Sequence, residues 1–168
     1  MPKGLKQSSS VIVIGFQVDE SAADTFTQGS IDLQLNPLDN EVFVVTAIDL
    51  NLGSPNMITA TNTQLQAALT TTSRTALPNL SDSACLAVSN KAIRSDAVNA
   101  VAYQDHSMET PPSMLEYIGI IATNDFFVQV QGTNNGTAKS VSGKVYGYRA
   151  TADAAVYAAL VQSEVLSS

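Results

Sequence analysis

Charged residues are scarce in this sequence. Only 14% of its 168 residues are charged, whereas about a quarter is typical of a soluble domain. Serine, threonine, asparagine, glutamine and alanine take their place. Removing such a surface from water costs little free energy when two copies meet, and interface cores are likewise depleted of charge. The composition favours a subunit that buries much of its surface against neighbours, although a low-charge domain outside any lattice has the same composition.

Positive charge is the scarcer sign. The chain has 8 Lys and Arg against 15 Asp and Glu, a net charge of −7. Phosphate affinity comes from clustered basic residues, so strong nucleic-acid binding is not expected. Lys3 and Lys6 precede three serines, and residues 1–10 resemble a short flexible arm. This arm could contact phosphate or lipid headgroups of an internal membrane, or be a frayed terminus.

Disulfides and long apolar runs are also missing. The single cysteine, Cys85, excludes an intrachain disulfide, and we expect a buried, unreactive thiol. No apolar run approaches the roughly 18 residues that span a bilayer. Residues 11–16 are too short for the apolar part of a secretory signal. We expect a chain made in the cytoplasm, with one domain over residues 11–168.

No catalytic motif stands out. Asp105, His106 and Glu109 could bind a divalent ion or transfer protons. They lie in a proline-flanked loop without a recognised metal-ligand spacing, which favours an ordinary surface loop. There is no Gly-x-Ser-x-Gly motif for a catalytic serine and no glycine-rich phosphate loop. We therefore expect no enzymatic activity, cofactor or metal.

Strand patterns dominate what is present. Residues 41–52 place Val42, Val44, Thr46, Ile48 and Leu50 on one face, while the other face is also apolar. A strand apolar on both faces is central or covered on each side. Residues 57–75 are ambiguous, with extended structure favoured. Alternation or β-branched content predicts further strands at 11–18, 30–35, 98–103, 114–122, 126–131 and 141–150.

The last two strands are predicted to form a hairpin. Between them, Asn134-Asn135-Gly136 supplies residues that tolerate positive φ. Phe126, Val128 and Val130 share one face of the first strand; Lys144, Tyr146 and Tyr148 share one face of the second. With Arg149, this second face resembles the aromatic and basic surfaces that bind nucleic acids or sugars. Tyrosine is equally common in sheets and interfaces.

Two segments have helical patterns. Residues 152–166 are rich in helix formers and are too apolar for a solitary solvated helix, so this helix should pack on the sheet or on another chain. Ser81 or Asp82 is a candidate N-cap for an internal helix ending near Arg94.

The many short strands, the late helix, the low charge and the richness in Thr, Asn and Ala resemble the small single-jelly-roll capsid proteins of non-tailed viruses. The resemblance covers the general character of most of the chain and rests on no signature motif. It implies two four-stranded antiparallel sheets packed as a β-sandwich, assembly into capsomers and no enzymatic activity. The two helices would be additions to that plan. The lack of a strongly basic arm differs from coats that package nucleic acid directly.

The expected function is a structural subunit of a self-assembling shell in a virion, with copies of itself and other virion proteins as partners. The alternatives are a sugar- or ligand-binding β-sandwich module and a subunit of a non-viral filament or surface layer. Apolar side chains would anchor the contacts between copies. The candidates are Phe127, Tyr146, Tyr148, Tyr157 and Leu160.

Overall fold

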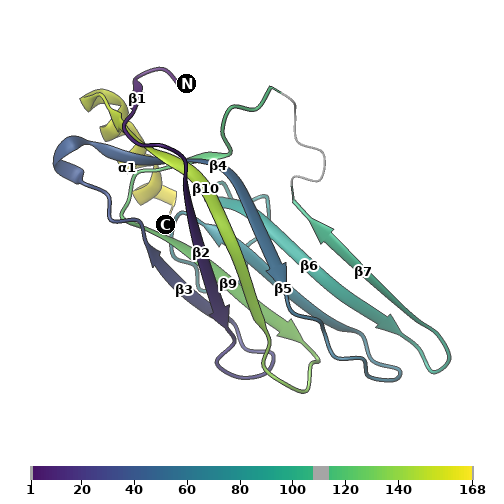
Figure 1. Ribbon diagram of the computed structural model, residues 1–168. Helices are drawn as coiled ribbons and strands as arrows, with labels where there is room; N and C mark the ends of the chain where they lie inside the picture. Colours follow the sequence, from purple (N-terminus) through teal and green to yellow (C-terminus); the bar gives the residue numbers. More distant parts are fainter. Residues whose placement is uncertain (1, 108–113, 168) are drawn as a thin grey trace.

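The computed structural model describes residues 2–107 and 114–167, which form two antiparallel sheets and a C-terminal helix (Figure 1). The predicted mainly-β sandwich with a C-terminal helix is confirmed. Sheet A contains β1 (Leu5–Gln7), β2 (Ile12–Asp19), β4 (Glu41–Leu52), β8 (Gly119–Ile121) and β10 (Ser140–Ala152). Sheet B contains β3 (Thr27–Asp32), β5 (Thr63–Thr70), β6 (Cys85–Ser95), β7 (Ala100–His106) and β9 (Asp125–Thr133). The helix is α1 (Ala154–Ser167), and a single 3-10 turn, η1 (Pro37–Asp39), precedes β4.

Eight of the strands pair as in a folded-over hairpin. Setting β1 and β7 aside, the first strand pairs with the last, β2 with β10, and the second with the seventh, β3 with β9. The third pairs with the sixth, β4 with β8, and the two middle strands, β5 and β6, pair with each other. This nesting is the topology of a jelly roll. The sheets are five-stranded rather than four-stranded because β1 adds to sheet A and β7 to sheet B.

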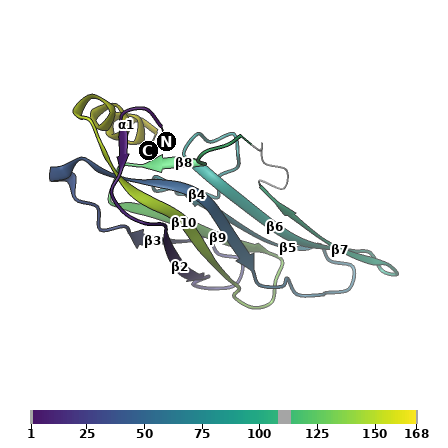
Figure 2. The same ribbon diagram turned by 45° about the horizontal axis from the view of Figure 1, so that its top comes forward.

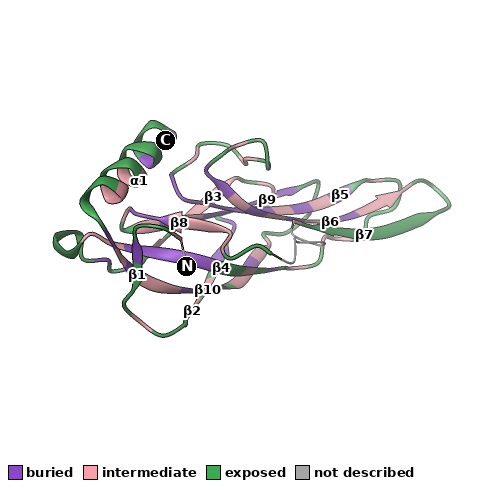
Figure 3. Cartoon of the chain, turned by 90° about the horizontal axis from the view of Figure 1, so that it is seen from above, coloured by how far each residue is buried: buried purple, intermediate pink, exposed green. Residues whose placement is uncertain are grey.

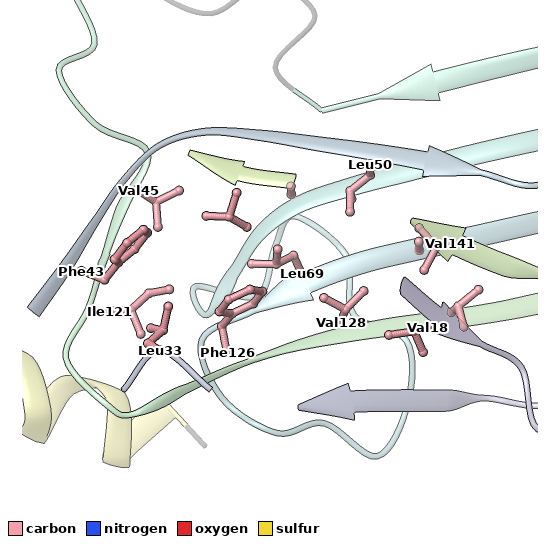
Figure 4. Close-up of a cluster of buried hydrophobic side chains, with 14 of the residues drawn as sticks. Val18, Leu33, Phe43, Val45, Leu50, Leu69, Ile121, Phe126, Val128 and Val141 are labelled. Carbon is pink, nitrogen blue, oxygen red and sulfur yellow. The ribbon is translucent and has the colours of Figure 1, made fainter. Parts of the chain in front are cut away.

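The main core lies between the sheets (Figure 4). Phe43, Val45 and Leu50 point inward from sheet A and meet Leu69, Phe126 and Val128 from sheet B. The rings of Phe16 and Phe126 pack edge to face, with centroids 5.9 Å apart. The predicted inward face of 126–130 is confirmed, since Phe126, Val128 and Val130 are fully buried.

A bulge in β4 changes which side chains face the core. Tyr146 lies opposite Ala47 and Gly147 opposite Val45, so Thr46 has no partner across the ladder. Its hydroxyl donates instead to the carbonyl of Tyr146 at 3.1 Å. One extra residue reverses the alternation of a strand. Phe43 and Val45 face the core before it, and Ile48, Leu50 and Leu52 after it. The predicted single face from Val42 to Leu50 is therefore wrong.

A second, smaller core lies on the outer face of sheet A. Val42, Val44 and Ala150 are buried there beneath α1, which sits at one end of the sandwich (Figures 2 and 3). On the other side of β4 lies the main core. The predicted cover on both faces of residues 41–52 is confirmed for residues 42–45 only, because the outward-facing Ala47, Asp49 and Asn51 are exposed. The predicted C-terminal helix is also confirmed, and it packs on its own sheet.

The predicted hairpin of the last two long strands is wrong. β9 pairs with β3 and β5 in sheet B, whereas β10 pairs with β1, β2 and β4 in sheet A. The intervening residues 134–139 cross from one sheet to the other, and Asn134 has the expected positive φ of 58°. Val128 on β9 and Val145 on β10 both point into the main core from opposite sheets. Asn-Asn-Gly suits a turn of either kind, so the local sequence did not distinguish them.

The predicted internal helix at 81–94 is also wrong, because most of this segment is strand β6. Asp82 does make a local turn, accepting from the backbone N–H of Ala84 at 3.0 Å. The chain then continues as a strand because β5 and β7 flank it on both sides. Ladder hydrogen bonds and burial here override a weak local helix pattern.

The N-terminal segment differs from the expected flexible arm. Leu5–Gln7 is strand β1, paired with β10, and Leu5 is buried in the smaller core. The backbone N–H of Ser8 donates to the carbonyl of Arg149 at 2.9 Å, and the N–H of Arg149 donates to the Ser9 hydroxyl. Residues 5–9 are thus held along β10. Leu5 is apolar and lies opposite Ala152, so burying it favours strand pairing here. The polar residues on either side of Leu5 made the segment resemble an exposed arm in the sequence.

Candidate interaction surfaces

Strand β7 is an edge of sheet B, and none of the residues that the structure describes pairs with its outer side. All seven of its residues are exposed, including Val101 at 60% and Tyr103 at 40%. It forms the flank of the sandwich farthest from β2 and β3 (Figure 1) and is exposed along its whole length (Figure 3). The guanidinium of Arg94 lies 5.8 Å from the Tyr103 ring centroid and donates to its hydroxyl at 3.2 Å. An apolar edge strand with both faces open is a ready site for another strand.

The direction of the β7 backbone groups follows from its pairing with β6. The N–H of Asp96 donates to Asn99 at one end of the hairpin, and the N–H of Ser107 donates to Val88 at the other. Hydrogen-bonded pairs alternate along an antiparallel ladder. Val101, Tyr103 and Asp105 therefore direct their backbone groups toward β6. The alternate residues Ala100, Ala102, Gln104 and His106 direct theirs outward.

A second apolar surface lies at the β2 edge of sheet A. Val11 is 63% exposed and Val13 is 50% exposed. Tyr146 lies between Val13 and Ala47 in the ladder and is half-buried. Lys144 and Asp49 form the neighbouring cross-strand pair. Of the predicted interface residues, Tyr146 is the one that belongs to this surface.

These two surfaces lie on opposite flanks of the sandwich. Strand β2 packs over β3, which is one edge of sheet B, and β7 is the other edge of the same sheet. We call them the β2 flank (Val11, Val13, Tyr146) and the β7 flank (Val98, Val101, Tyr103). Residues 98–103 and 11–18 were predicted as strands, but the open exposure of Val13, Val101 and Tyr103 depends on strand order. No sequence signal assigned them to interfaces.

Three predicted interface residues already pack within the chain. Tyr148, Tyr157 and Leu160 lie around the smaller core beneath α1. Phe127 is half-buried on the outer face of β9, and with Thr71, Thr123 and Val165 it lines a shallow pocket of about 270 Å³ beside the end of α1. The proposed pair of tyrosine rings is not a continuous platform, because Tyr148 packs in the α1 cluster and Tyr146 lies beyond it.

Two of the three candidate ion-binding residues lie in the part of the chain that the structure describes. Asp105 and His106 lie on β7 as neighbours on opposite faces, and Glu109 lies outside the described residues. The Nδ1 atom of His106 is 2.9 Å from the Ser89 hydroxyl, and its Nε2 contacts the amide of Gln104. Among the residues that the structure describes, no group of three His, Cys, Asp or Glu side chains could hold a metal ion.

The cysteine is buried, as predicted. Burial raises the pKa of the Cys85 thiol to about 11, so it is almost entirely protonated near neutral pH. Lys3 and Lys6 are both exposed, and Lys6 lies on β1. Their contact with a membrane stays a prediction. Within the described ranges, no helix has the length and apolar character needed to cross a bilayer.

Comparison with known proteins gives little similarity. No protein-family model matches the chain, and no curated protein matches it significantly. A structure of Desmodium yellow mottle tymovirus aligns over 88% of this chain and 86% of that chain, with 11% identity and a TM-score of 0.31. A tailspike protein, gp49 of the Acinetobacter baumannii bacteriophage Fri1, described as a capsular polysaccharide depolymerase, aligns over 74% of this chain and 21% of that chain. There the identity is 10% and the TM-score 0.16.

Proposed function

We propose that this protein is a structural subunit of a self-assembling shell, with a viral capsid as the favoured shell. Its partners are copies of itself and other virion proteins, its place is the virion, and it has no catalytic role. The observation that carries this proposal is the pair of exposed apolar surfaces on opposite flanks, Val11 and Val13 on one, Val101 and Tyr103 on the other.

Two surfaces matter because of how contacts propagate. A subunit with one self-complementary patch stops at a dimer, whereas a second patch elsewhere lets contacts continue into rings, lattices or closed shells. The low charge of the chain supports the same conclusion, since few charged side chains must lose water when the flanks meet.

The jelly-roll topology supports the proposal only by analogy. This architecture occurs in viral capsids and also in lectins, and a fold does not define a function. A sugar-binding module would need an open aromatic platform. The candidate platform is interrupted where Tyr148 joins the α1 cluster, so the flank surfaces favour the shell over the sugar-binding alternative.

The test is size measurement of the purified chain, followed by negative-stain electron microscopy. We expect closed particles at raised protein concentration. Filaments would support the non-viral filament alternative, and a monomer at all concentrations that binds glycans would contradict the proposal.

Matched variants connect the particles to the flanks. Val13→Lys and Tyr103→Lys each place a charge on one flank and should each stop growth at small oligomers. Leu38→Lys is the control, because Leu38 is 91% exposed on η1, away from both flanks. Particles that form equally well in all three variants would contradict the assignment.

A further inference from the structure

We infer that the β7 edge binds the β7 edge of a second copy, antiparallel and about a two-fold axis at Tyr103. The inference rests on the proposed function and identifies one contact of the assembly. This edge-to-edge contact joins two copies of sheet B into one continuous sheet. The hydrogen-bonding direction, the side-chain faces and the charges of β7 together define the register.

The backbone restricts the pairing to a few registers. Among the described residues of β7, Ala100, Ala102, Gln104 and His106 direct backbone groups toward the open edge. An antiparallel partner must set outward-directed residues opposite each other. Three registers centred near the middle of β7 meet this condition. They place Ala102 opposite Ala102 of the second copy, Ala102 opposite Gln104, or Gln104 opposite Gln104.

Charge selects among these three registers. On the outer face, Arg94 on β6 lies beside Val101, and Asn90 lies beside Asp105. With Ala102 opposite Gln104 of the second copy, Asp105 lies opposite Val101 of that copy, whose neighbour in the same row is Arg94. The Cα atoms of Asp105 and that Arg94 are then two strand spacings apart, about 10 Å, which their side chains can bridge across valine. The symmetry makes this ion pair twice.

The other registers lack this complementarity. With Ala102 opposite Ala102, Asp105 lies opposite Asn99 of the second copy, in the row that ends at Asp96, so two carboxylates share a row. With Gln104 opposite Gln104, Asp105 lies opposite Tyr103, and Arg94 shares its row with Ser107. Only the chosen register brings Asp105 and Arg94 into one row.

The chosen register also puts aromatic rings at the centre. Tyr103 lies opposite Tyr103 of the second copy at a position without ladder hydrogen bonds between the two copies, where Cα atoms approach to about 4.5 Å. Cross-strand aromatic pairs stabilise antiparallel sheets. Each Tyr103 ring already contacts Arg94 of its own chain. In this register each Arg94 also faces Asp105 of the other copy, so pairing of the two edges leaves neither charge without a partner.

Disulfide trapping tests the register directly. Tyr103→Cys should form a disulfide-linked dimer under mild oxidation, because Cα separations of about 4.4–6.8 Å suit a disulfide. Val101→Cys is the matched control on the same face: two copies of it lie four residues apart along the strands, about 13 Å, and should not cross-link. A mixture of Val101→Cys and Asp105→Cys proteins should form a mixed disulfide. The natural chain is a blank, since Cys85 is buried.

The mixed disulfide keeps Tyr103 intact, so the test survives if Tyr103→Cys does not fold. Dominant cross-linking of Ala102→Cys with itself, or of Val101→Cys with Tyr103→Cys, would overturn the register. No cross-link at any of these positions in assembled protein would overturn edge pairing altogether.

Proline provides a second measurement. Ala102→Pro removes an outward N–H, which an edge strand tolerates, and leaves the hydrogen bonds to β6 in place. We expect the dimer dissociation constant to rise at least about tenfold, whereas Ala102→Val, which retains the N–H, should dimerise. Particles that assemble normally with Ala102→Pro would overturn edge pairing but not the shell. A cross-linked dimer that never assembles further would support edge pairing and contradict the shell.

Discussion

The carboxylate of Glu164 on α1 accepts a hydrogen bond of 2.7 Å from the backbone N–H of Ala122, the residue after β8. Its other oxygen accepts from the N–H of Thr123 at 2.9 Å. Glu164 is buried, and the α1 side chains around the smaller core are Val156, Tyr157, Leu160 and Val161. Apolar packing is not directional, so the two hydrogen bonds of this carboxylate help to set where the C-terminal half of α1 lies on the sheet.

We expect Glu164→Gln to weaken the attachment of α1. The amide group turns a donor toward one of the two backbone N–H groups, and an unsatisfied buried donor costs about 1–3 kcal/mol. Urea unfolding should show this loss in the free energy of unfolding. Gln162→Glu, at an exposed position of the same helix, should change it little. Equal effects from the two variants would argue against an anchoring role.

Glu20 connects three segments at the opposite end of the sandwich. Its carboxylate accepts from the backbone N–H groups of Thr25, Gly132 and Lys139 at 3.1, 2.9 and 2.9 Å. Glu20→Gln leaves one N–H facing a donor, so we expect a loss of about 1–3 kcal/mol in the free energy of unfolding. Thermal or urea denaturation measures it. The neighbouring exposed Asp19→Asn should be close to neutral, and a neutral Glu20→Gln would contradict the prediction.

Gly147 allows β10 and β4 to approach beside the bulge. A Cβ on Gly147 would lie 2.2 Å from the Val44 carbonyl oxygen and 2.7 Å from the Phe43 ring. Gly147→Ala must displace backbone, so we expect a loss of about 1–3 kcal/mol. Gly15→Ala is the control in the neighbouring strand, because its Cβ would meet nothing closer than 4.0 Å. Equal stability of the two variants would contradict this close approach.

The ion pair of Arg74 and Asp82 predicts a dependence on acid pH. The Nε of Arg74 donates to Asp82 at 2.6 Å and its Nη2 donates at 2.9 Å. The hydrogen bond from Arg74 lowers the pKa of Asp82 below its ordinary value. A carboxylate with a lowered folded-state pKa contributes its full stability above the unfolded pKa, about 3.9, and loses it as the pH falls through the folded value.

Asp82→Asn should therefore reduce the fall in unfolding free energy below about pH 4. At neutral pH the variant should be less stable by roughly 1 kcal/mol, the upper range for partly exposed pairs. Unfolding curves at a series of pH values measure both effects. Asp96→Asn is a comparison without an arginine partner: the backbone N–H of Asn99 lowers the pKa of Asp96. An unchanged acid slope in Asp82→Asn would contradict the assignment.

Local pattern was sufficient to predict the bounds of one strand and the inward face of another. The bounds of β4, residues 41–52, agree with the prediction, and Phe126, Val128 and Val130 point inward as their alternation indicates. Pattern failed at β6, where small residues such as Ala87 and Ser89 have no strong preference and the pairing partners decide. It also failed for β9 and β10, because a turn sequence does not specify whether the chain stays in one sheet.

The candidate surfaces depended on tertiary structure in the same way. Tyr157 and Leu160 have the apolar character of interface residues, but α1 packs them on its own sheet. Val101 and Tyr103 are ordinary strand residues in sequence, yet β7 continues sheet B beyond the edge of the jelly roll, so no described residue covers them.

The class of this protein follows from its residue pattern alone: a sandwich of antiparallel strands with few charges and a late helix. Side-chain alternation and helix propensity are local properties, and most of the strands and the terminal helix retain them in the folded chain. The pairing of the strands and the exposure of particular apolar side chains became known from the folded arrangement. Those outcomes depend on hydrogen bonds and burial between residues far apart in the chain, such as β2 with β10, which a local pattern does not encode.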